Sequence, residues 1–298
     1  MQFIIIDLEW NNTYSRKQQG FFNEIIEIGA VKLNTSLEQT GTFSQVIRSQ
    51  VGKKLRSSVK KLTNISNDEM RSGELFTKTF SHFRKWVGED ETVFFTWGDS
   101  DIRVLYENYR YLNGINTIPF LTDYCDLQAC YHKVCNVNTG MQAGLSTAAL
   151  NVGLDPDAYA HHRALDDSLL TADIFRRIYN PDIFKTFYKK CDSEFYNRLF
   201  FKAKVITNID SPLVDKSLFC CTCEKCGVKC VETTKFKFRG QYFRGCFKCP
   251  QCGTDYNVGV RFKKYFDRVD IKKVVSVCKP EPEKKDNAEL SETDNGGE

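Results

Sequence analysis

Two acids near the start of the chain flank a single leucine, as Asp7, Leu8 and Glu9 directly after the apolar run 3–6. The apolar run predicts a buried strand, whose side chains alternate between two faces at about 3.3 Å per residue. Asp7 and Glu9 therefore share one face, roughly 6.6 Å apart. Carboxylates so placed can share hard cations, although a lone pair of this kind is more often two solvated acids at a strand end.

Two further acids lie early in predicted helices, on the side that holds the apolar residues. The neighbours at helical spacing are Val104, Leu105, Asn108 and Leu112 after Asp101, and Leu170, Thr171, Ile174 and Ile178 after Asp167. This phase predicts that both acids point inward, which is costly unless they bind something. A two-metal nuclease site needs about four carboxylates around cations roughly 3.5 to 4 Å apart. Asp99, by contrast, is explained by helix capping, and Asp166 leans toward solvent.

One histidine could serve these acids, because His162 precedes Asp167 by five residues near the predicted helix start. There it could take a proton from water, since the ordinary pKa of histidine suits that task. A surface histidine at a helix start is the simpler interpretation of His162, and of His161 beside it.

The ordered set resembles the DEDDh exonucleases, with Asp7-x-Glu9, then Asp101 after an aromatic strand and Trp-Gly, then His162 and Asp167. Residues 24–31 (EIIEIGAV) are similar to the second strand of that family, and residues 162–167 (HRALDD) to its third motif. The likeness covers roughly residues 2 to 180, and the set is far more specific than any one motif. It implies a ribonuclease H-like fold and a 3′–5′ exonuclease that uses two Mg²⁺ or Mn²⁺ ions and releases nucleoside 5′-monophosphates.

By position, the resemblance implies roles for individual residues. The implied metal ligands are Asp7, Glu9, Asp101 and Asp167, and the implied general base is His162. Leu8 would contribute backbone near the terminal nucleotide. Trp10 stands where many members have a small or hydroxyl residue, a pattern that resembles the histone-mRNA and small-RNA-trimming subgroup. It favours RNA as substrate, while core packing explains Trp10 equally well.

The elements that must position these residues form a predicted α/β fold, a mixed sheet flanked by helices. The predicted strands cover residues 3–10, 23–33, 41–47, 92–97 and 120–124, and the predicted helices cover 75–87, 100–112, 127–134, 145–152 and 163–179. Residues 51–73 read as a loop with short helical turns. We expect an exonuclease domain over 1–180, a helical connector over 181–218, a zinc-ribbon module over 219–268 and a disordered acidic tail over 279–298.

The cysteines indicate the second module, because eight of the thirteen lie between Cys220 and Cys252. Two pairs, Cys223 with Cys226 and Cys249 with Cys252, each have two intervening residues and a following glycine. Four thiolates in two glycine knuckles are typical of a ribbon that binds one Zn²⁺. An iron–sulfur cluster is the competing interpretation, on the run Cys220, Cys223, Cys226 and Cys230. The roles of Cys220, Cys221, Cys230 and Cys246 stay open.

Basic and aromatic residues alternate between the two knuckles, about a glycine turn. The cations are Lys235, Lys237, Arg239 and Arg244. Residues 232–268 hold nine Lys or Arg and three Asp or Glu, a local charge of +6. This pattern predicts a hairpin that binds single-stranded nucleic acid beyond the catalytic residues. The alternatives are that the phenylalanines only pack the small module, or that the face docks a protein.

Composition limits the class of protein. With 298 residues, 41% of them hydrophobic, the chain can bury a sizeable core. It shows no apolar leader and no membrane-length apolar run, so we expect a cytoplasmic protein with reduced thiols and no membrane partner. The leading hypothesis is a metal-dependent 3′–5′ exonuclease that acts on single strands, with RNA favoured. The alternatives are a non-catalytic nucleic-acid-binding protein that works through the ribbon, and a DNA proofreading or repair exonuclease.

Overall fold

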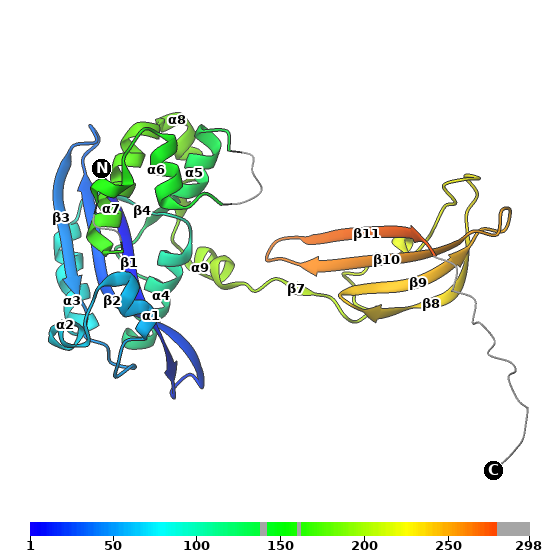
Figure 1. Ribbon diagram of the computed structural model, residues 1–298, viewed down its shortest axis with the longest axis horizontal. Helices are drawn as coiled ribbons and strands as arrows, with labels where there is room; N and C mark the ends of the chain where they lie inside the picture. Colours follow the sequence, from blue (N-terminus) through cyan, green and yellow to red (C-terminus); the bar gives the residue numbers. More distant parts are fainter. Residues whose placement is uncertain (138–141, 160–161, 279–298) are drawn as a thin grey trace, which may run out of the picture. The chain divides into compact units, whose positions relative to one another are not determined.

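The computed structural model describes residues 1–137, 142–159 and 162–278 and divides into two compact units (Figure 1). The first unit is Met1–Phe200 and the second begins at Phe201. The predicted acidic tail and His161 lie outside the described residues. Within the described ranges, none of the helices is both long and apolar enough to cross a bilayer.

The first unit is built on a six-stranded sheet of order β3-β2-β1-β4-β5-β6. Its strands are β1 (Gln2–Ser15), β2 (Gly20–Leu33), β3 (Gln39–Val46), β4 (Thr92–Thr96), β5 (Asp123–Asp126) and β6 (Lys189–Lys190). The first three are antiparallel, β4 and β5 run parallel to β1, and β6 pairs antiparallel with β5. The mixed sheet is confirmed, and it begins with the expected meander.

Helices cover both faces of this sheet. One face carries α3 (Phe76–Val87), α4 (Ser100–Asn113) and α9 (Ser193–Phe200), and the other carries α5 (Leu127–Val134), α6 (Leu145–Asn151), α7 (Ala164–Ile178) and α8 (Pro181–Phe184). Strand alternation sets this division, because Ile4 and Ile6 pack with the first group and Phe3 and Ile5 with the second. The predicted loop over 51–73 holds α1 (Ser57–Thr63) and α2 (Asn67–Ser72). Short 3₁₀ turns cover Pro156–Ala158, Lys185–Phe187 and Lys216–Leu218.

The second unit is a five-stranded antiparallel sheet around its own apolar core. Its strands are β7 (Lys204–Val205), β8 (Val231–Arg239), β9 (Tyr242–Lys248), β10 (Asp255–Lys264) and β11 (Val269–Val277). The expected hairpin is β8 and β9, whose turn residues Gly240 and Gln241 both have positive φ. Positive φ at both positions matches the twist of the paired strands.

The predicted connector over 181–218 differs from the structure. Helices α8 and α9 pack in the two cores of the first unit, while β7 pairs with β10 in the second. The structure therefore divides this segment at Phe200, and the sheet of the second unit continues past residue 268 to Val277. The amphipathic α9 buries Phe195, Tyr196 and Leu199, which explains why it belongs to the first core.

Candidate active site and thiol cluster

Three acids from two elements meet on the sheet face that α7 covers. Asp7 and Glu9 alternate with the buried Leu8 on β1, and Asp167 lies in the first turn of α7. One carboxylate oxygen from each acid lies within 4.8 Å of the others. Oxygen donors this close fit divalent cations, since Mg²⁺ and Mn²⁺ prefer carboxylate ligands. The structure thus brings together three of the four acids that sequence reasoning selected.

Burial and the charges of neighbouring carboxylates raise the pKa values of Asp7 and Glu9. The pKa of Asp7 is raised well above its ordinary value by burial, and then by the charges of Asp101, Asp167 and Glu9. Burial is also the main cause that raises the pKa of Glu9 to about 8, with Asp167 and Glu27 adding to it. Carboxylates held together in this way carry protons unless cations offset their charge. The electrostatics therefore favour a cation site.

The fourth acid, Asp101, lies beside this group rather than in it. It is buried, as its helical phase predicts, and its Oδ1 accepts a hydrogen bond of 3.0 Å from the backbone N–H of Leu8. Burial raises its pKa to about 7, an effect that its hydrogen bonds oppose. Asp101 therefore fixes the short stretch of β1 between the two acids. Asp99 takes the predicted N-cap position of α4, but its side chain makes no capping hydrogen bond and pairs with Arg103 at 2.8 Å instead.

His162 lies at the mouth of the acid cluster. Together with Asp7 and Asp167, it lines a cavity of about 500 Å³. Its backbone N–H lies 3.2 Å from Oδ2 of Asp167, and its φ is +61°. A positive φ is uncommon for a residue with a side chain, so the turn before α7 is held in an unusual conformation. The histidine predicted from sequence is thus exposed and next to the acids.

Helix α7 is held against the sheet by a buried ion pair that sequence reasoning missed. Glu27 on β2 is 1% exposed and accepts hydrogen bonds from Arg163 Nη2 at 2.6 Å and from the backbone N–H of Ala164 at 3.1 Å. Beside it, a Cβ on Gly29 would come within 2.0 Å of the Ala164 backbone, so only glycine allows this close approach. These contacts set the position of Asp167. The available signal was Glu27 itself, an acid inside an apolar strand.

The opposite wall of the cavity is the start of α6, which was also missed. Residues 144–147 line the cavity together with Trp97. The Ala143 carbonyl accepts hydrogen bonds from Trp97 Nε1 at 3.2 Å and from Gln128 Nε2 at 2.9 Å, and the Ala143 N–H donates to His132 Nε2 at 3.1 Å. Three side chains therefore fix one backbone turn, which gives the cavity a built wall.

The two apolar residues predicted to touch substrate lie differently. Leu8 is 3% exposed and belongs to the core between the sheet and α3 and α4, so its side chain is structural. Trp10 is partly buried and packs against the same core. Core packing thus accounts for Trp10, and a role in substrate choice stays a prediction.

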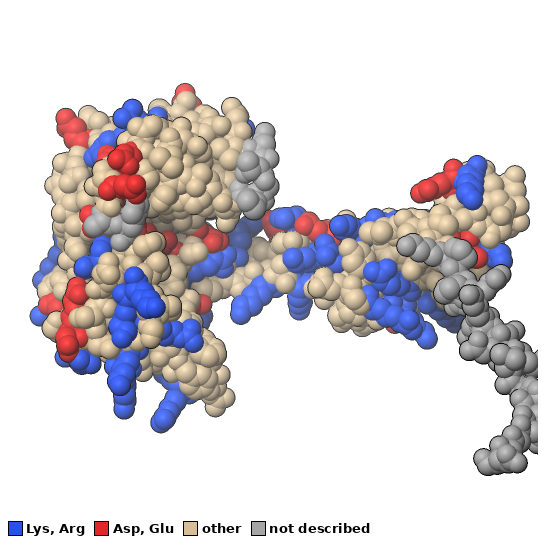
Figure 2. Space-filling model, viewed as in Figure 1, with Lys and Arg blue, Asp and Glu red and all other residues tan. Residues whose placement is uncertain are grey.

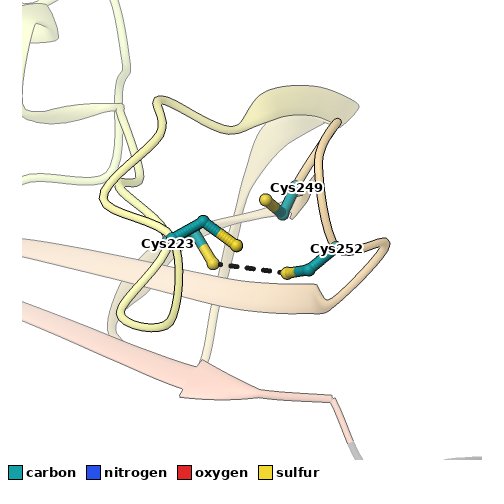
Figure 3. Close-up of side chains that lie close together, drawn as sticks. Cys223, Cys249 and Cys252 are labelled. Atoms are coloured by element: carbon teal, nitrogen blue, oxygen red, sulfur yellow. Dashed lines mark hydrogen bonds between the residues drawn. The ribbon is translucent and has the colours of Figure 1, made fainter.

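In the second unit, four cysteines converge from two matching turns, and Figure 3 shows three of them, Cys223, Cys249 and Cys252. Sulfur atoms of Cys223, Cys226, Cys249 and Cys252 lie within 4.8 Å of one another. In both turns the first cysteine accepts from the glycine N–H, at 2.9 Å for Gly227 and 3.0 Å for Gly253. Both glycines have positive φ, +67° and +69°. Four soft donors in repeated glycine knuckles fit a tetrahedral Zn²⁺ site.

Hydrogen bonds shift the pKa values of the clustered thiols in both directions, and the hydrogen bond with Cys252 raises the pKa of Cys226 to about 12. The Thr254 hydroxyl is the main cause that lowers the pKa of Cys252 to about 6, and the Tyr256 hydroxyl lowers that of Cys223. The predicted iron–sulfur run does not converge: the Cys230 N–H pairs with the Cys221 carbonyl at 2.9 Å, and Cys220 Sγ lies 3.4 Å from Lys273 Nζ. Among the described residues, Cys220 and Cys230 are in neither group of close metal-binding side chains.

The basic residues of the β8–β9 hairpin line a hollow of their own. Lys235, Lys237, Arg239 and Arg244 border a cavity of about 520 Å³ that also includes Asn257. The aromatic residues between them divide. Phe236 stacks inside on Phe219 at 4.3 Å, whereas Phe238 is 37% exposed. The packing interpretation thus holds for one phenylalanine, and one stays at the surface.

Comparisons with known proteins place the fold of the first unit in a family. The family model described as Exonuclease (RNase_T) matches residues 4–175. The chain is 32% identical over 178 residues to the probable 3′–5′ exonuclease KapD of Bacillus subtilis, covering 59% of this chain and 83% of that protein. It is 27% identical over 165 residues to 3′–5′ exoribonuclease 1 of Rattus norvegicus, covering 53% of this chain and 47% of that protein.

Solved structures give the same result. The nuclease domain of 3′hExo, a DEDDh family member bound to rAMP, has a TM-score of 0.53 and 26% identity, covering 59% of this chain and 90% of that one. Cell-death related nuclease 4, at 17% identity, has a TM-score of 0.51, covers 59% of this chain and 62% of that one, and shows the fold alone.

The chain therefore belongs to the exonuclease family, with the ribonuclease H-like fold in its first unit. Within that family it is a DEDDh-type 3′–5′ exonuclease, similar to KapD and to 3′hExo. The family match ends before the second unit begins.

Proposed function

We propose that the chain removes nucleoside 5′-monophosphates from the 3′ ends of single-stranded RNA, using two Mg²⁺ or Mn²⁺ ions. The observation that carries this proposal is the meeting of Asp7, Glu9 and Asp167 within 4.8 Å beside a cavity that His162 also lines. Divalent cations at these acids would offset the negative charge that develops on the phosphate.

The roles of the residues follow from their places. Asp7, Glu9 and Asp167 would hold the cations directly, and the buried Asp101 would complete the site while it orients Leu8. His162, exposed at the cavity mouth, would take the proton from the attacking water. The cavity of about 500 Å³ suits one terminal nucleotide, with Trp97 available as an apolar wall.

Two observations support RNA over DNA. The rat relative is named an exoribonuclease, 3′hExo was solved with rAMP, and a similar 3′-exonuclease was solved in recognition of a histone mRNA stem-loop. The second observation is Trp10 directly after Glu9, a pattern that resembles the histone-mRNA and small-RNA-trimming subgroup of the family.

We further propose that the four cysteines bind one Zn²⁺ and that the cationic hairpin of the second unit binds the same single strand. The matched knuckles support the zinc site. Lys235, Lys237 and Arg244 around one hollow, with Phe238 exposed, support the strand-binding role, since backbone neutralisation and stacking are how single strands are usually bound.

Digestion of matched RNA and DNA 20-mers, labelled at the 5′ end, tests the catalytic proposal. With Mg²⁺ or Mn²⁺ we expect a ladder that shortens from the 3′ end and nucleoside 5′-monophosphates by mass, with RNA digested faster. Faster digestion of DNA would reassign the substrate, and release of nucleoside 3′-monophosphates would reject the mechanism. Metal analysis of the purified chain should find one zinc and no iron.

A further inference from the structure

The β1–β2 hairpin continues well beyond the rest of the sheet. β1 pairs with β2 as far as Ser15 and Gly20, whereas β4 pairs only with residues 2–5 of β1 and β3 pairs with β2 only from Glu27 onward. Residues 11–15 and 20–24 therefore form a two-stranded arm, dark blue in Figure 1, that begins two residues after Glu9. The strand that carries two of the acids thus also carries the arm.

A basic segment is fastened alongside this arm. Residues 39–67 contain six Lys or Arg and no Asp or Glu, and the cations are Arg48, Lys53, Lys54, Arg56, Lys60 and Lys61. Asn11 holds the segment from the arm: its side chain donates to the Lys54 carbonyl at 3.3 Å and accepts from the Arg56 N–H at 3.0 Å. These contacts use backbone groups, so the side chains of Lys53, Lys54 and Arg56 remain exposed.

A buried carboxylate fixes the same segment from the other strand. Glu24 is 3% exposed and accepts hydrogen bonds from the backbone N–H groups of Val51 at 2.7 Å and Gly52 at 2.8 Å. The carboxylate oxygens of Glu24 thus bind backbone N–H groups and not the nearby lysines. Among the described residues, no carboxylate lies within ion-pair distance of Lys53, Lys54 or Arg56.

The arm itself exposes two aromatic rings. Tyr14 is 55% exposed and Phe21 is 70% exposed, and as cross-strand neighbours they meet edge to face at 6.0 Å. Arg16 and Lys17 follow at the turn, where Lys17 lies 4.7 Å above the ring of Tyr111. Exposed apolar groups that lie together often mark an interaction site. Surfaces that bind single strands combine aromatic rings, on which bases stack, with cations that contact phosphates. Figure 2 shows Lys and Arg side chains projecting at the end of this unit where Figure 1 places the arm.

We propose that this arm surface, defined as Tyr14, Arg16, Phe21, Lys53, Lys54 and Arg56, binds the single strand on the 5′ side of the nucleotide being removed. The inference rests on the proposed function and extends it from the terminal nucleotide to the strand behind it. From Glu9 to Tyr14 the strand rises about 17 Å, five residues at ~3.4 Å each. The lysines and arginines would contact phosphates, and the rings would stack on bases, so the surface selects an unpaired strand without reading its sequence.

Binding is measured on the full chain carrying Asp7→Asn, so that no strand is consumed, with a fluorescent oligo(U) 20-mer and a salt titration. The triple variant Lys53→Ala, Lys54→Ala, Arg56→Ala should bind about tenfold or more weakly. The slope of the logarithm of its binding constant against the logarithm of salt concentration should be smaller in magnitude by about 2, at roughly 0.7 for each phosphate that the variant no longer neutralises. The pair Tyr14→Ala, Phe21→Ala should bind about fivefold or more weakly with an unchanged salt slope, because stacking is not ionic.

Arg84→Ala with Lys85→Ala is the matched control, since both cations are exposed at the far end of α3. It should bind as the parent does, and Lys53→Arg with Lys54→Arg should retain affinity. A duplex of the same length should bind no tighter than the single strand. The inference is overturned if the arm variants bind as the control does, or if the duplex is preferred.

A second readout uses chains with Asp7 intact and compares a 20-mer with a dinucleotide. The kcat/KM for the 20-mer divided by that for the dinucleotide should fall about tenfold in the arm variants, because only the longer strand reaches the arm. An unchanged ratio contradicts the inference.

The proposed function and the proposed arm surface can be rejected independently of each other. A chain that binds through the arm but releases no nucleotide rejects the proposed function alone, and an active chain with normal arm-variant affinity rejects the arm alone.

Discussion

The acid cluster of the first unit and the thiol cluster of the second are both groups of side chains that could hold a metal ion, with ligand atoms within 4.8 Å of one another, yet they are built differently. The thiols come from two turns with the same backbone hydrogen bonds and a glycine of positive φ in each, and the cluster consists of four cysteines. The acids come from a strand and a helix, and two of them, Asp7 and Asp167, line a cavity. A closed set of four ligands is the mark of a structural site, and an open set leaves room for substrate and water.

The two clusters also differ in how protons compete with cations. Burial and neighbouring carboxylates raise the pKa values of Asp7, Glu9 and Asp101. In the thiol cluster, hydroxyl hydrogen bonds lower the pKa values of Cys223 and Cys252, while the hydrogen bond with Cys252 raises that of Cys226 to about 12. The acid cluster is therefore sensitive to pH around neutrality until cations bind. This difference fits a thiol cluster that stabilises a fold and an acid cluster that performs chemistry.

The largest expected effect comes from breaking the thiol cluster. Cys249→Ser should abolish zinc binding and unfold the second unit, because structural zinc supplies about 10 kcal/mol or more to small modules. Metal analysis and the near-ultraviolet circular dichroism of the module aromatics measure this. Cys135→Ser, at an exposed cysteine of the first unit, is the control. A Cys249→Ser chain that keeps one zinc would show that the cluster is not the site.

Removing the predicted base should have the next largest effect. We expect His162→Ala to lower kcat by about 10² to 10⁴, the usual contribution of a positioned general base, with little change in melting temperature. The matched control is His82→Ala, because the His82 side chain is exposed on α3 and pairs with Glu74. A His162→Ala enzyme within threefold of the native rate contradicts the assigned role.

A smaller loss should follow from moving α7 without touching a ligand. Gly29→Ala places a Cβ 2.0 Å from the Ala164 backbone, so α7 and Asp167 must shift. We expect kcat to fall about 10²-fold, as misplacements near 1 Å do. Gly20→Ala is the control, since its Cβ would meet only ordinary contact at 3.8 Å. Equal activity of the two variants would show that the close approach does not set the site.

The smallest expected effect is a pH dependence of the folding stability of the first unit, measured without added divalent cations. Glu9 has a pKa of about 8 in the folded chain against an ordinary 4.5, and Asp101 about 7 against 3.8. The folded state thus holds protons that the unfolded state releases, so this stability is complete below about pH 4 and is lost as pH rises through 7 to 8. The melting temperature of the first unit should fall by a few degrees from pH 5 to 8.

Mg²⁺ should restore that melting temperature at pH 8 far more than at pH 5, because cations replace the lost protons. Glu9→Gln should flatten the pH dependence, which differential scanning calorimetry can follow. A melting temperature that is flat over this range in the native chain would contradict the raised pKa values.

Sequence reasoning located the parts of both clusters that depend on local pattern. Strand alternation placed Asp7 and Glu9 on one face, helical phase buried Asp101, and the two Cys-x2-Cys pairs marked the knuckles. What it missed depends on contacts between distant segments. Glu27 and Arg163 are 136 positions apart, and no local pattern links them.

The missed strands have the same cause. β10 and β11 pair with each other and with β9, so they are stabilised by a core that forms only when the whole second unit folds. The sequence predicts one connector over 181–218, because the partners of its apolar residues cannot be recognised from sequence. Its halves separate only because α9 meets the core of α3 and α4 while β7 meets β10.

The central claim, that the acid cluster is the catalytic site and the thiol cluster is not, is tested most directly by one digestion assay. Native chain, Asp7→Asn and Cys252→Ser are compared on an RNA dinucleotide with Mg²⁺, and released nucleoside 5′-monophosphate is quantified by mass. We expect a loss of at least about a thousandfold for Asp7→Asn, since a proposed cation ligand is removed, and a rate within about threefold of native for Cys252→Ser. A native rate in Asp7→Asn, or the larger loss in Cys252→Ser, would contradict it.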